Sequence, residues 1–252
     1  MFDDLPRPLL FAHRGASAEA PENTLEAFER AVQHGADVLE LDVHLSADEN
    51  VVVFHDETVD RTTNGTGRVA ARTLRELRAL DAGYSMDSFR GRGVTVPLLS
   101  EVLAAFPSAA FNIELKSEDT RLLRLTLEAL DGVSPRRVVL AGGKVNVMAR
   151  LEAAKSVFPL GMSRAGIMDV LKRVWTGRPV PVRYQGRALQ IPPRQGHIPV
   201  ATRPVIRAAQ RGGLEVHIWT LKDPVDAKRW IRRGVGGIMS DDPGALAPIF
   251  KR

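Results

Sequence analysis

Short runs of apolar residues alternate along the chain with stretches in which apolar positions recur every three or four residues. The first pattern predicts strands and the second predicts amphipathic helices. The expected strands are Leu9–His13, Val38–Leu45, Val51–His55, Phe111–Lys116, Val138–Ala141, Phe158–Met162, Ala188–Ile191, Glu215–Thr220 and Gly237–Ser240. The expected helices are Thr24–His34, Ser100–Phe106, Thr120–Leu130, Val145–Ser156, Ala165–Trp175, Thr202–Arg211, Pro224–Arg233 and Gly244–Phe250. Such alternation is typical of βαβ units in a parallel sheet.

Two local features refine this picture. Asn23 immediately precedes the first helical pattern, and Glu26 lies three residues after Asn23. This spacing predicts a capping box with Asn23 at the N-cap. The strands Val38–Leu45 and Val51–His55 are joined by five residues without a helix. Residues 57–97, rich in Gly, Thr and Arg, lack the alternation and are expected to form a small insertion in one domain that spans 1–252.

Roughly eight βα units in about 250 residues match the size of a (β/α)8 TIM barrel. We therefore predict an α/β fold of this kind, with the small insertion after the second strand region. A doubly wound open sheet is the runner-up, but no glycine-rich phosphate loop follows the first strand to favour it. A barrel predicts that catalytic groups lie at the C-terminal ends of its strands.

Composition narrows the chemistry. The chain has 252 residues, is 44% hydrophobic and contains no cysteine. A disulfide framework, a zinc–thiolate site, an iron–sulfur cluster and a cysteine nucleophile are thereby excluded. No apolar run approaches the length that crosses a bilayer. Asp3 and Asp4 stand where a signal peptide would carry basic residues, so we expect a cytoplasmic protein.

Charge is distributed unevenly. Residues 1–120 hold 11 basic and 21 acidic side chains, whereas residues 121–252 hold 24 and 9. The stretch Lys172–Arg211 contains nine basic residues and no acidic one. It forms either a solvated helix face or a face that meets anionic substrates or lipid headgroups in a transient membrane-surface contact. Nucleic acid is not expected as a partner, because no aromatic residues of the kind that stack bases are interleaved. The sequence does not determine an oligomeric state.

Charged residues fall at the ends of five expected strands. Glu40 and Asp42 lie two apart on one strand, so both carboxylates project from the same face. Glu114 and Lys116 repeat this spacing. The other strand-end residues are His13, Arg14, His55, His217 and Trp219. Each of these residues alone has a structural explanation, such as a hydrogen-bonded histidine or an ordinary ion pair. Inward positions of a barrel prefer Val, Ile and Leu, so charged residues at the ends of five strands together favour a functional site.

The residue types indicate phosphoryl chemistry. Three carboxylates without cysteine make a hard oxygen site suited to one divalent cation, Mg²⁺ or Ca²⁺, rather than zinc. The positive charges of Arg14 and Lys116 are suited to bind an anion that is also bound by the metal. Two histidines remain to move protons.

At these residues the sequence resembles the glycerophosphodiester phosphodiesterase family. The similarity runs in order along nearly the whole chain. The matching segments are His13-Arg14-Gly15, Pro21-Glu22-Asn23-Thr24, Glu40-Leu41-Asp42-Val43, Val53-Phe54-His55-Asp56 with Arg61-Thr62-Thr63, Glu114-Leu115-Lys116, Val216-His217-Ile218-Trp219-Thr220 and Gly234-Val235-Gly236-Gly237-Ile238-Met239-Ser240-Asp241-Asp242-Pro243. Lys222 and Met239-Ser240 depart from the usual pattern and bear on substrate preference rather than on the reaction class.

The resemblance implies metal-dependent hydrolysis of a glycerophosphodiester to sn-glycerol 3-phosphate and an alcohol. It implies metal ligation by Glu40, Asp42 and Glu114. The other implied roles are acid–base catalysis for His13 and His55, phosphate contacts for Arg14 and Lys116, and packing beside the glycerol carbons for Trp219. The alternatives are lysophospholipase D-type hydrolysis of a lipid phosphodiester in the same site, and a non-catalytic phosphate-binding protein.

Overall fold

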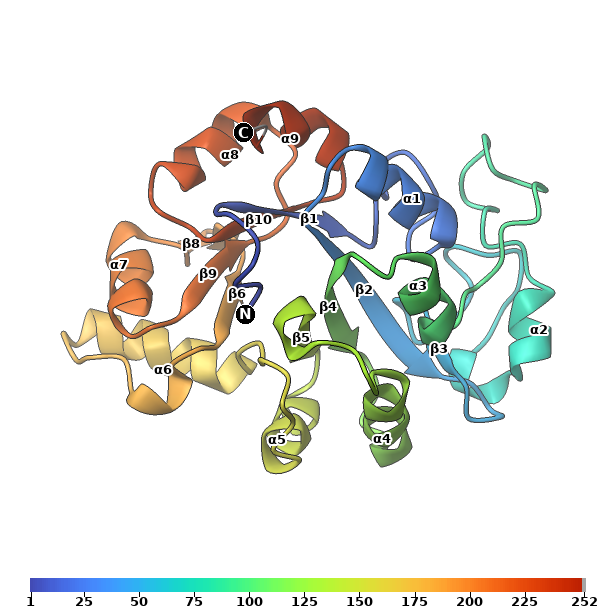
Figure 1. Cartoon of the computed structure of the whole chain (residues 1–252), viewed down its shortest axis with the longest axis horizontal. Helices are drawn as coiled ribbons and strands as arrows, with labels where there is room; N and C mark the ends of the chain where they lie inside the picture. The colour runs from blue at the N-terminus through green and yellow to red at the C-terminus, as the bar shows by residue number, and fades with distance from the viewer. Residues whose placement is uncertain (251–252) are drawn as a thin grey trace.

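A ring of helices surrounds a strongly curved sheet in the computed structural model, which describes residues 1–250 (Figure 1). The strands are β1 (Leu9–His13), β2 (Val38–Leu45), β3 (Val51–Val53), β4 (Ala110–Leu115), β5 (Val138–Gly142), β6 (Ala188–Ile191), β7 (Arg194–Gln195), β8 (Ile198–Pro199), β9 (Glu215–Ile218) and β10 (Gly237–Ser240). The α-helices are α1 (Leu25–Gln33), α2 (Leu74–Arg78), α3 (Leu99–Ala105), α4 (Thr120–Ala129), α5 (Val145–Ala153), α6 (Arg164–Trp175), α7 (Arg203–Arg211), α8 (Pro224–Ile231) and α9 (Pro243–Phe250).

The main sheet has eight strands in the order β5-β4-β2-β1-β10-β9-β6, with β3 paired antiparallel to β2 beside this path. Neighbours along the path are parallel. The first and last strands of the chain, β1 and β10, lie side by side. This nearly closed parallel sheet with helices outside confirms the predicted TIM barrel.

Residues 158–162 occupy the place between β5 and β6. The prediction of a strand there is wrong, because this segment makes only isolated bridges, Leu140 with Leu160 and Gly161 with Ala188. Pro159 has no amide proton to donate to a ladder, and Gly161 has no side chain to pack, so a regular strand does not form. The segment still joins its neighbours, since the amide of Leu140 donates to the carbonyl of Pro159 over 2.9 Å.

The first helix also begins differently from the prediction. Thr24, not Asn23, is the N-cap of α1, and its side chain accepts from the amide of Ala27. Asn23 instead adopts φ = 59°, outside the extended conformation of an N-cap. Its side chain is used elsewhere, as described below.

Side chains of the central strands alternate between the barrel interior and the helix layer. Leu9 and Phe11 of β1 point inward and pack with Val38 of β2 in a cluster that fills the N-terminal half of the barrel. The outward residues Leu39 and Leu41 belong to the layer beneath the helices. Along β1, β2 and β4 the inward positions therefore change from apolar to polar or charged, and the charges gather at the C-terminal ends.

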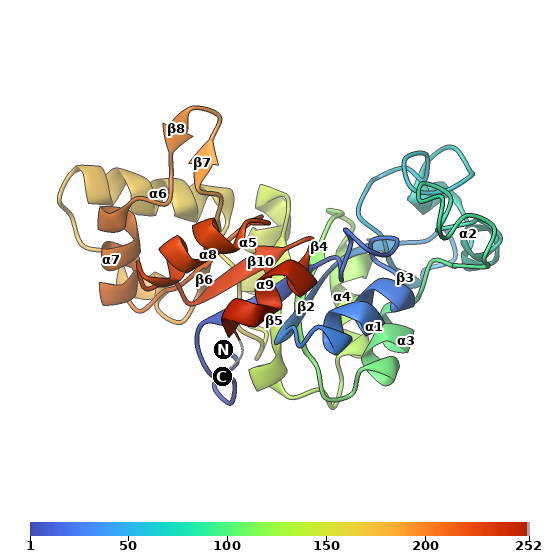
Figure 2. The same ribbon diagram turned by 90° about the horizontal axis from the view of Figure 1, so that it is seen from above.

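Two segments project from the same side of the barrel at opposite ends of the molecule (Figure 2). One is the β7–β8 hairpin, and the other is the stretch around α2. The second stretch packs against β3 in a separate hydrophobic cluster, Val52, Phe54, Val59, Val69, Leu77, Ala82, Val94 and Val96. Within residues 1–250, none of the helices combines the length and the apolar composition that crossing a lipid bilayer demands.

Candidate active site

Strand register brings the charged residues of the barrel into one cluster. His13 of β1 pairs in register with Glu40 of β2. Asp42, two residues further along β2, pairs in register with Glu114 of β4. Because residues two apart on a strand share a face, all four side chains project into the same end of the barrel. The two-residue spacing seen in the sequence is thus the direct cause of the site.

Glu40, Asp42 and Glu114 form an acidic cluster in which one oxygen from each lies within 4.8 Å of the others. Glu40 and Asp42 are buried, and Glu114 is partly exposed. Gly143 follows β5 and faces this cluster, where an added Cβ would lie 2.5 Å from the Glu114 carboxylate. Glycine at this position leaves the space beside the cluster open.

Two cations and an amide hold Asp42. The Lys116 Nζ atom lies 3.3 Å from Asp42 Oδ1, and the Arg14 Nε atom lies 3.4 Å from Asp42 Oδ2. Asn23 donates to Asp42 Oδ2 over 3.0 Å and accepts the Asp42 amide over 3.2 Å. Burial alone would raise the pKa of Asp42, but Lys116, His55 and Arg14 outweigh it and hold that pKa below its usual range. Asp42 is therefore a fixed negative charge.

Glu40 behaves in the opposite way. It accepts the backbone amide of Arg14 over 2.9 Å, and its Oε2 atom lies 4.0 Å from Nε2 of His13. Burial and the neighbouring Asp42 carboxylate raise the pKa of Glu40 to about 8. The cations of the protein therefore do not compensate the full negative charge that these acids would carry when ionised.

The acidic cluster fits a hard divalent cation. It offers only oxygen atoms, which are the ligands that Mg²⁺ and Ca²⁺ prefer. Burial and the Asp42 carboxylate raise the pKa of Glu40, an effect that a bound cation would oppose, and the glycine at 143 leaves the space beside the cluster open. Both observations are consistent with a metal held by these three residues.

Each of the two histidines has a carboxylate partner on the same ring atom. The Nδ1 atom of His13 lies 2.6 Å from Oδ1 of Asp241, and that of His55 lies 2.5 Å from Oδ1 of Asp56. Burial opposes the charged form of His13, but Glu40 and Asp241 outweigh it and raise its pKa. A carboxylate that accepts Nδ1–H leaves Nε2 as the atom that can exchange a proton with a ligand.

A chain of ion pairs fixes the second histidine relative to the cations. Arg61 donates to Asp56 over 2.6 Å and to Glu22 over 2.6 and 2.8 Å. Glu22 in turn accepts from Arg14 Nη1 over 3.0 Å. The segment that follows β3 is thereby connected to the loop that follows β1. Through Asp56, these contacts fix the orientation of the His55 ring.

The turn after β1 depends on one glycine. Arg14 and Gly15 have φ values of 58° and 81°, and this turn directs the Arg14 amide toward Glu40. A Cβ at Gly15 would lie 2.6 Å from the backbone carbon of Ala27 in α1. We expect Gly15→Ala to lower the free energy of unfolding by about 2–4 kcal/mol, from overpacking and left-handed backbone strain together. Urea denaturation measures this, and Gly67→Ala, with similar φ but open space, is the control. An equal loss in both variants would contradict the steric argument.

The structure brings most of the predicted site residues together. Glu40, Asp42, Glu114, His13, Arg14 and Lys116 are joined by the contacts above, and His55 acts electrostatically on Asp42. Trp219 follows β9 and is 40% exposed at the same end of the barrel. Its predicted packing against glycerol stays a prediction.

Sequence reasoning did not identify the residues that support these groups. They are Glu22, Asn23, Asp56, Arg61 and Asp241. All five lie inside the segments quoted above, but nothing in their spacing indicates which residue each one contacts. Asp241 contacts His13, whereas its neighbour Asp242 accepts the amide of Ala245 in the last helix.

Comparisons with known proteins agree with this geometry. The Glycerophosphoryl diester phosphodiesterase family profile matches residues 13–245. A glycerophosphodiester phosphodiesterase of Caldanaerobacter subterraneus subsp. tengcongensis is 31% identical over 98% of this chain and 99% of its own. Human lysophospholipase D GDPD1 is 29% identical over 93% of this chain and 83% of its own. The structure of an Oleispira antarctica phosphodiesterase in complex with the product sn-glycerol-3-phosphate superposes with a TM-score of 0.80 at 25% identity, covering 96% of both chains.

Proposed function

The chain belongs to the glycerophosphoryl diester phosphodiesterase family, and we propose that it hydrolyses glycerophosphodiesters to sn-glycerol 3-phosphate and an alcohol with the help of one divalent cation, Mg²⁺ or Ca²⁺. One observation carries the proposal. Three carboxylates, of which Glu40 and Asp42 are buried, lie together with two cations and two carboxylate-backed histidines at one end of the barrel. The relative solved with sn-glycerol-3-phosphate supports the identity of the product.

Phosphate binding falls to the cations of the site. Glu40, Asp42 and Glu114 would hold the metal, which when bound supplies Lewis-acid neutralisation of charge on the phosphate. Lys116 places its ammonium beside the same carboxylates. The Arg14 guanidinium, whose Nε atom lies 3.4 Å from Asp42 Oδ2, would add a second positive charge beside the phosphate. These donors are fixed before the substrate arrives, and they therefore stabilise charge that develops in the transition state.

Proton transfer falls to the two histidines. One imidazole takes a proton from the nucleophile, which is water or the substrate's own glycerol hydroxyl, as a bond to phosphorus forms. The other donates a proton to the leaving alkoxide oxygen as its bond to phosphorus breaks. Hydroxyl attack forms a cyclic phosphate, which water then opens with the proton roles reversed. Asp241 and Asp56 hold the rings so that Nε2 of each can act. Trp219 would pack beside the glycerol carbons.

A second candidate is lysophospholipase D-type hydrolysis of a lipid phosphodiester in the same site. The similarity to human lysophospholipase D GDPD1 over 93% of this chain favours it. The same metal ligands, cations and histidines would serve, because the scissile phosphodiester is chemically the same. The two candidates differ only in the alcohol or lipid portion of the substrate.

The test is release of glycerol 3-phosphate from glycerophosphocholine by metal-stripped protein. We expect activity after addition of Mg²⁺ or Ca²⁺, none with EDTA, and strongly reduced activity in a His13→Ala control with metal present. Activity toward a lysolipid without activity toward glycerophosphocholine would favour the second candidate. Inactivity toward both substrates with every metal would contradict the proposed function.

A further inference from the structure

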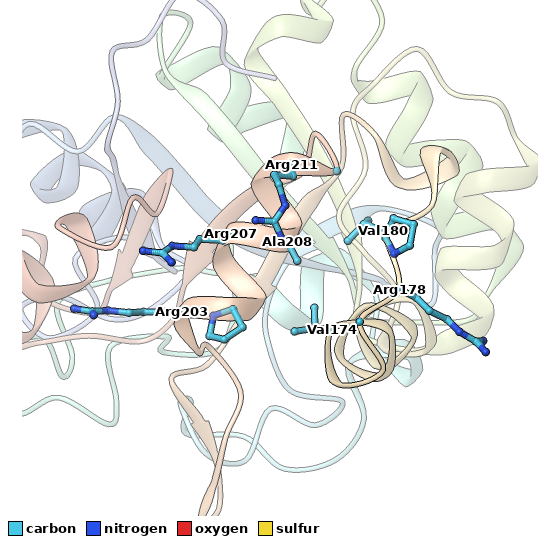
Figure 3. A pocket seen from close by; sticks show the side chains of 11 residues that line it. Val174, Arg178, Val180, Arg203, Arg207, Ala208 and Arg211 are labelled. Carbon is cyan, nitrogen blue, oxygen red and sulfur yellow. The ribbon is translucent and has the colours of Figure 1, made fainter.

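An arginine-bordered groove lies between α6 and α7, outside the barrel. Its volume is about 570 Å³, and its borders include Arg178 after α6 and Arg203, Arg207 and Arg211 along α7. The three α7 arginines are spaced four residues apart and so share one face of that helix. Figure 3 shows the side chains of Arg203 and Arg207 extending away to one side of the groove and that of Arg178 to the other.

A second groove lies on the other side of α7. It has a volume of about 420 Å³, and Arg203 borders it as well, together with Arg194 of the β7–β8 hairpin and Arg229 and Arg233 of the α8 region. Burial and the guanidinium groups of Arg229 and Arg203 lower the pKa of Arg233, so these like charges repel each other. The Nε atom of Arg233 is buried and has no hydrogen-bond partner within the described residues.

The protein itself does little to neutralise these arginines. Among the described residues that line the two grooves, Asp226 is the one carboxylate. The nearby Arg173 and Arg183 differ, because both pair with Asp169 over 2.9 Å. We call the seven bordering arginines the arginine face: Arg178, Arg194, Arg203, Arg207, Arg211, Arg229 and Arg233.

Apolar groups accompany these charges. Val174, Val180 and Ala208 lie between the outward-pointing arginines of the first groove (Figure 3). Trp175, which ends α6 next to this groove, is 66% exposed, and Ile198 of the hairpin beside the second groove is 61% exposed. Arginines that extend outward around apolar side chains and an exposed tryptophan are the features of a protein surface that rests on a lipid headgroup layer.

We propose that the arginine face, with Trp175 and Ile198, docks the enzyme on the surface of an anionic phospholipid membrane. The guanidinium groups of Arg203 and Arg207 extend to one side of the first groove and that of Arg178 to the other, instead of converging on one point, so they match a layer of many phosphates better than a single small anion (Figure 3). The second groove includes Leu221, two residues after Trp219 at the barrel mouth. The docked enzyme therefore holds its active site near the lipids from which glycerophosphodiesters and lysolipids derive.

Sedimentation with vesicles tests the proposal on the full chain without requiring catalysis. The wild type is expected to bind vesicles of phosphatidylcholine mixed with phosphatidylglycerol, to bind vesicles of pure phosphatidylcholine weakly, and to lose binding as salt rises. Arg203→Gln/Arg207→Gln should weaken partitioning to anionic vesicles about tenfold or more. Trp175→Ala should abolish the residual vesicle binding that the wild type retains at high salt.

The matched control is Arg75→Gln/Arg92→Gln, which removes the same charge from exposed arginines in the segment around α2. It should bind like the wild type. Absence of binding to anionic vesicles, or equal loss in the control, would overturn the proposal, as would arginine-dependent binding to single-stranded DNA in place of vesicles. All variants should hydrolyse soluble glycerophosphocholine like the wild type, so failure to dock and failure of the proposed function are separate results.

Discussion

His13→Ala and His55→Ala are each expected to lower kcat for glycerophosphocholine by about 10²–10⁴-fold, the usual contribution of one acid or base. The reason is geometric. Each imidazole is oriented by a carboxylate at Nδ1, over 2.6 Å for His13 and 2.5 Å for His55, which leaves its Nε2 atom to exchange the proton that the alanine variant cannot exchange. Steady-state kinetics at saturating metal measures the effect. His34→Ala is the control, because His34, the C-cap residue of α1, pairs with Glu19 instead of with a residue of the site.

A change of leaving group separates the two roles. A glycerophosphodiester of 4-nitrophenol releases a stable phenolate that does not require protonation, so loss of the general acid should matter little on this substrate. One of the two variants should therefore recover most of its activity, and the other should not. The recovered variant identifies the acid. In the wild type kcat/KM should follow a bell-shaped pH dependence, and each variant should lose one limb of it. Equal defects on both substrates would contradict the division of roles between His13 and His55.

The charged end of the barrel could be predicted from the sequence because a strand has a strict period of two. Glu40 and Asp42 occupy positions that alternate with Leu39 and Leu41, and the structure places the first pair inside and the second pair under the helices. Charged residues at inward positions of several strands have no common structural explanation. The pattern therefore indicated a site before any contact was known.

The partners of the histidines could not be predicted in this way. Asp241 is 228 residues from His13 in sequence and meets it because β10 lies beside β1 when the barrel closes. Arg61 reaches Glu22 across 39 residues from a segment without regular strand–helix alternation. Spacing within one element specifies a face, but contacts between elements depend on strand register and loop conformation, which no local pattern contains.

The start of α1 shows how a contact in the site decides between two equally suitable N-cap residues. Asn23 and Thr24 are both good N-cap residues, so propensity alone does not choose between them. Asn23 makes two hydrogen bonds with Asp42, and its backbone adopts the left-handed conformation that this requires. Thr24 then caps the helix. The first residue of the helix is thus determined by Asp42, a residue of the site that lies 19 positions from Asn23 in the sequence.

The second large effect is expected from Asp42→Asn, which keeps the shape of the side chain and removes its charge. Asp42 is the carboxylate that contacts both Lys116 and Arg14, each of which is mostly buried. Breaking one side of a buried pair typically costs about 3–5 kcal/mol. Relief of the repulsion on Glu40 offsets part of this cost, so we expect the free energy of unfolding to fall by about 2–4 kcal/mol. Activity should fall about 10³-fold or more, because several kcal/mol of charge stabilisation on the phosphate depend on the acidic cluster.

Urea denaturation without metal measures the first effect, and the shift of melting temperature on addition of Mg²⁺ or Ca²⁺ measures the contribution of the metal. The wild type should be stabilised by the cation that supports activity, and Asp42→Asn should not. Glu114→Gln is the matched comparison. Glu114 is more exposed than Asp42, and Lys116 is the site cation that it contacts. Glu114→Gln should therefore lose the stabilisation by metal but lose less stability than Asp42→Asn when no metal is present. If Asp42→Asn instead gained metal-free stability, repulsion among the acids would outweigh their pairing with the cations, and Asp42 would be held in place by the fold at a net cost in free energy.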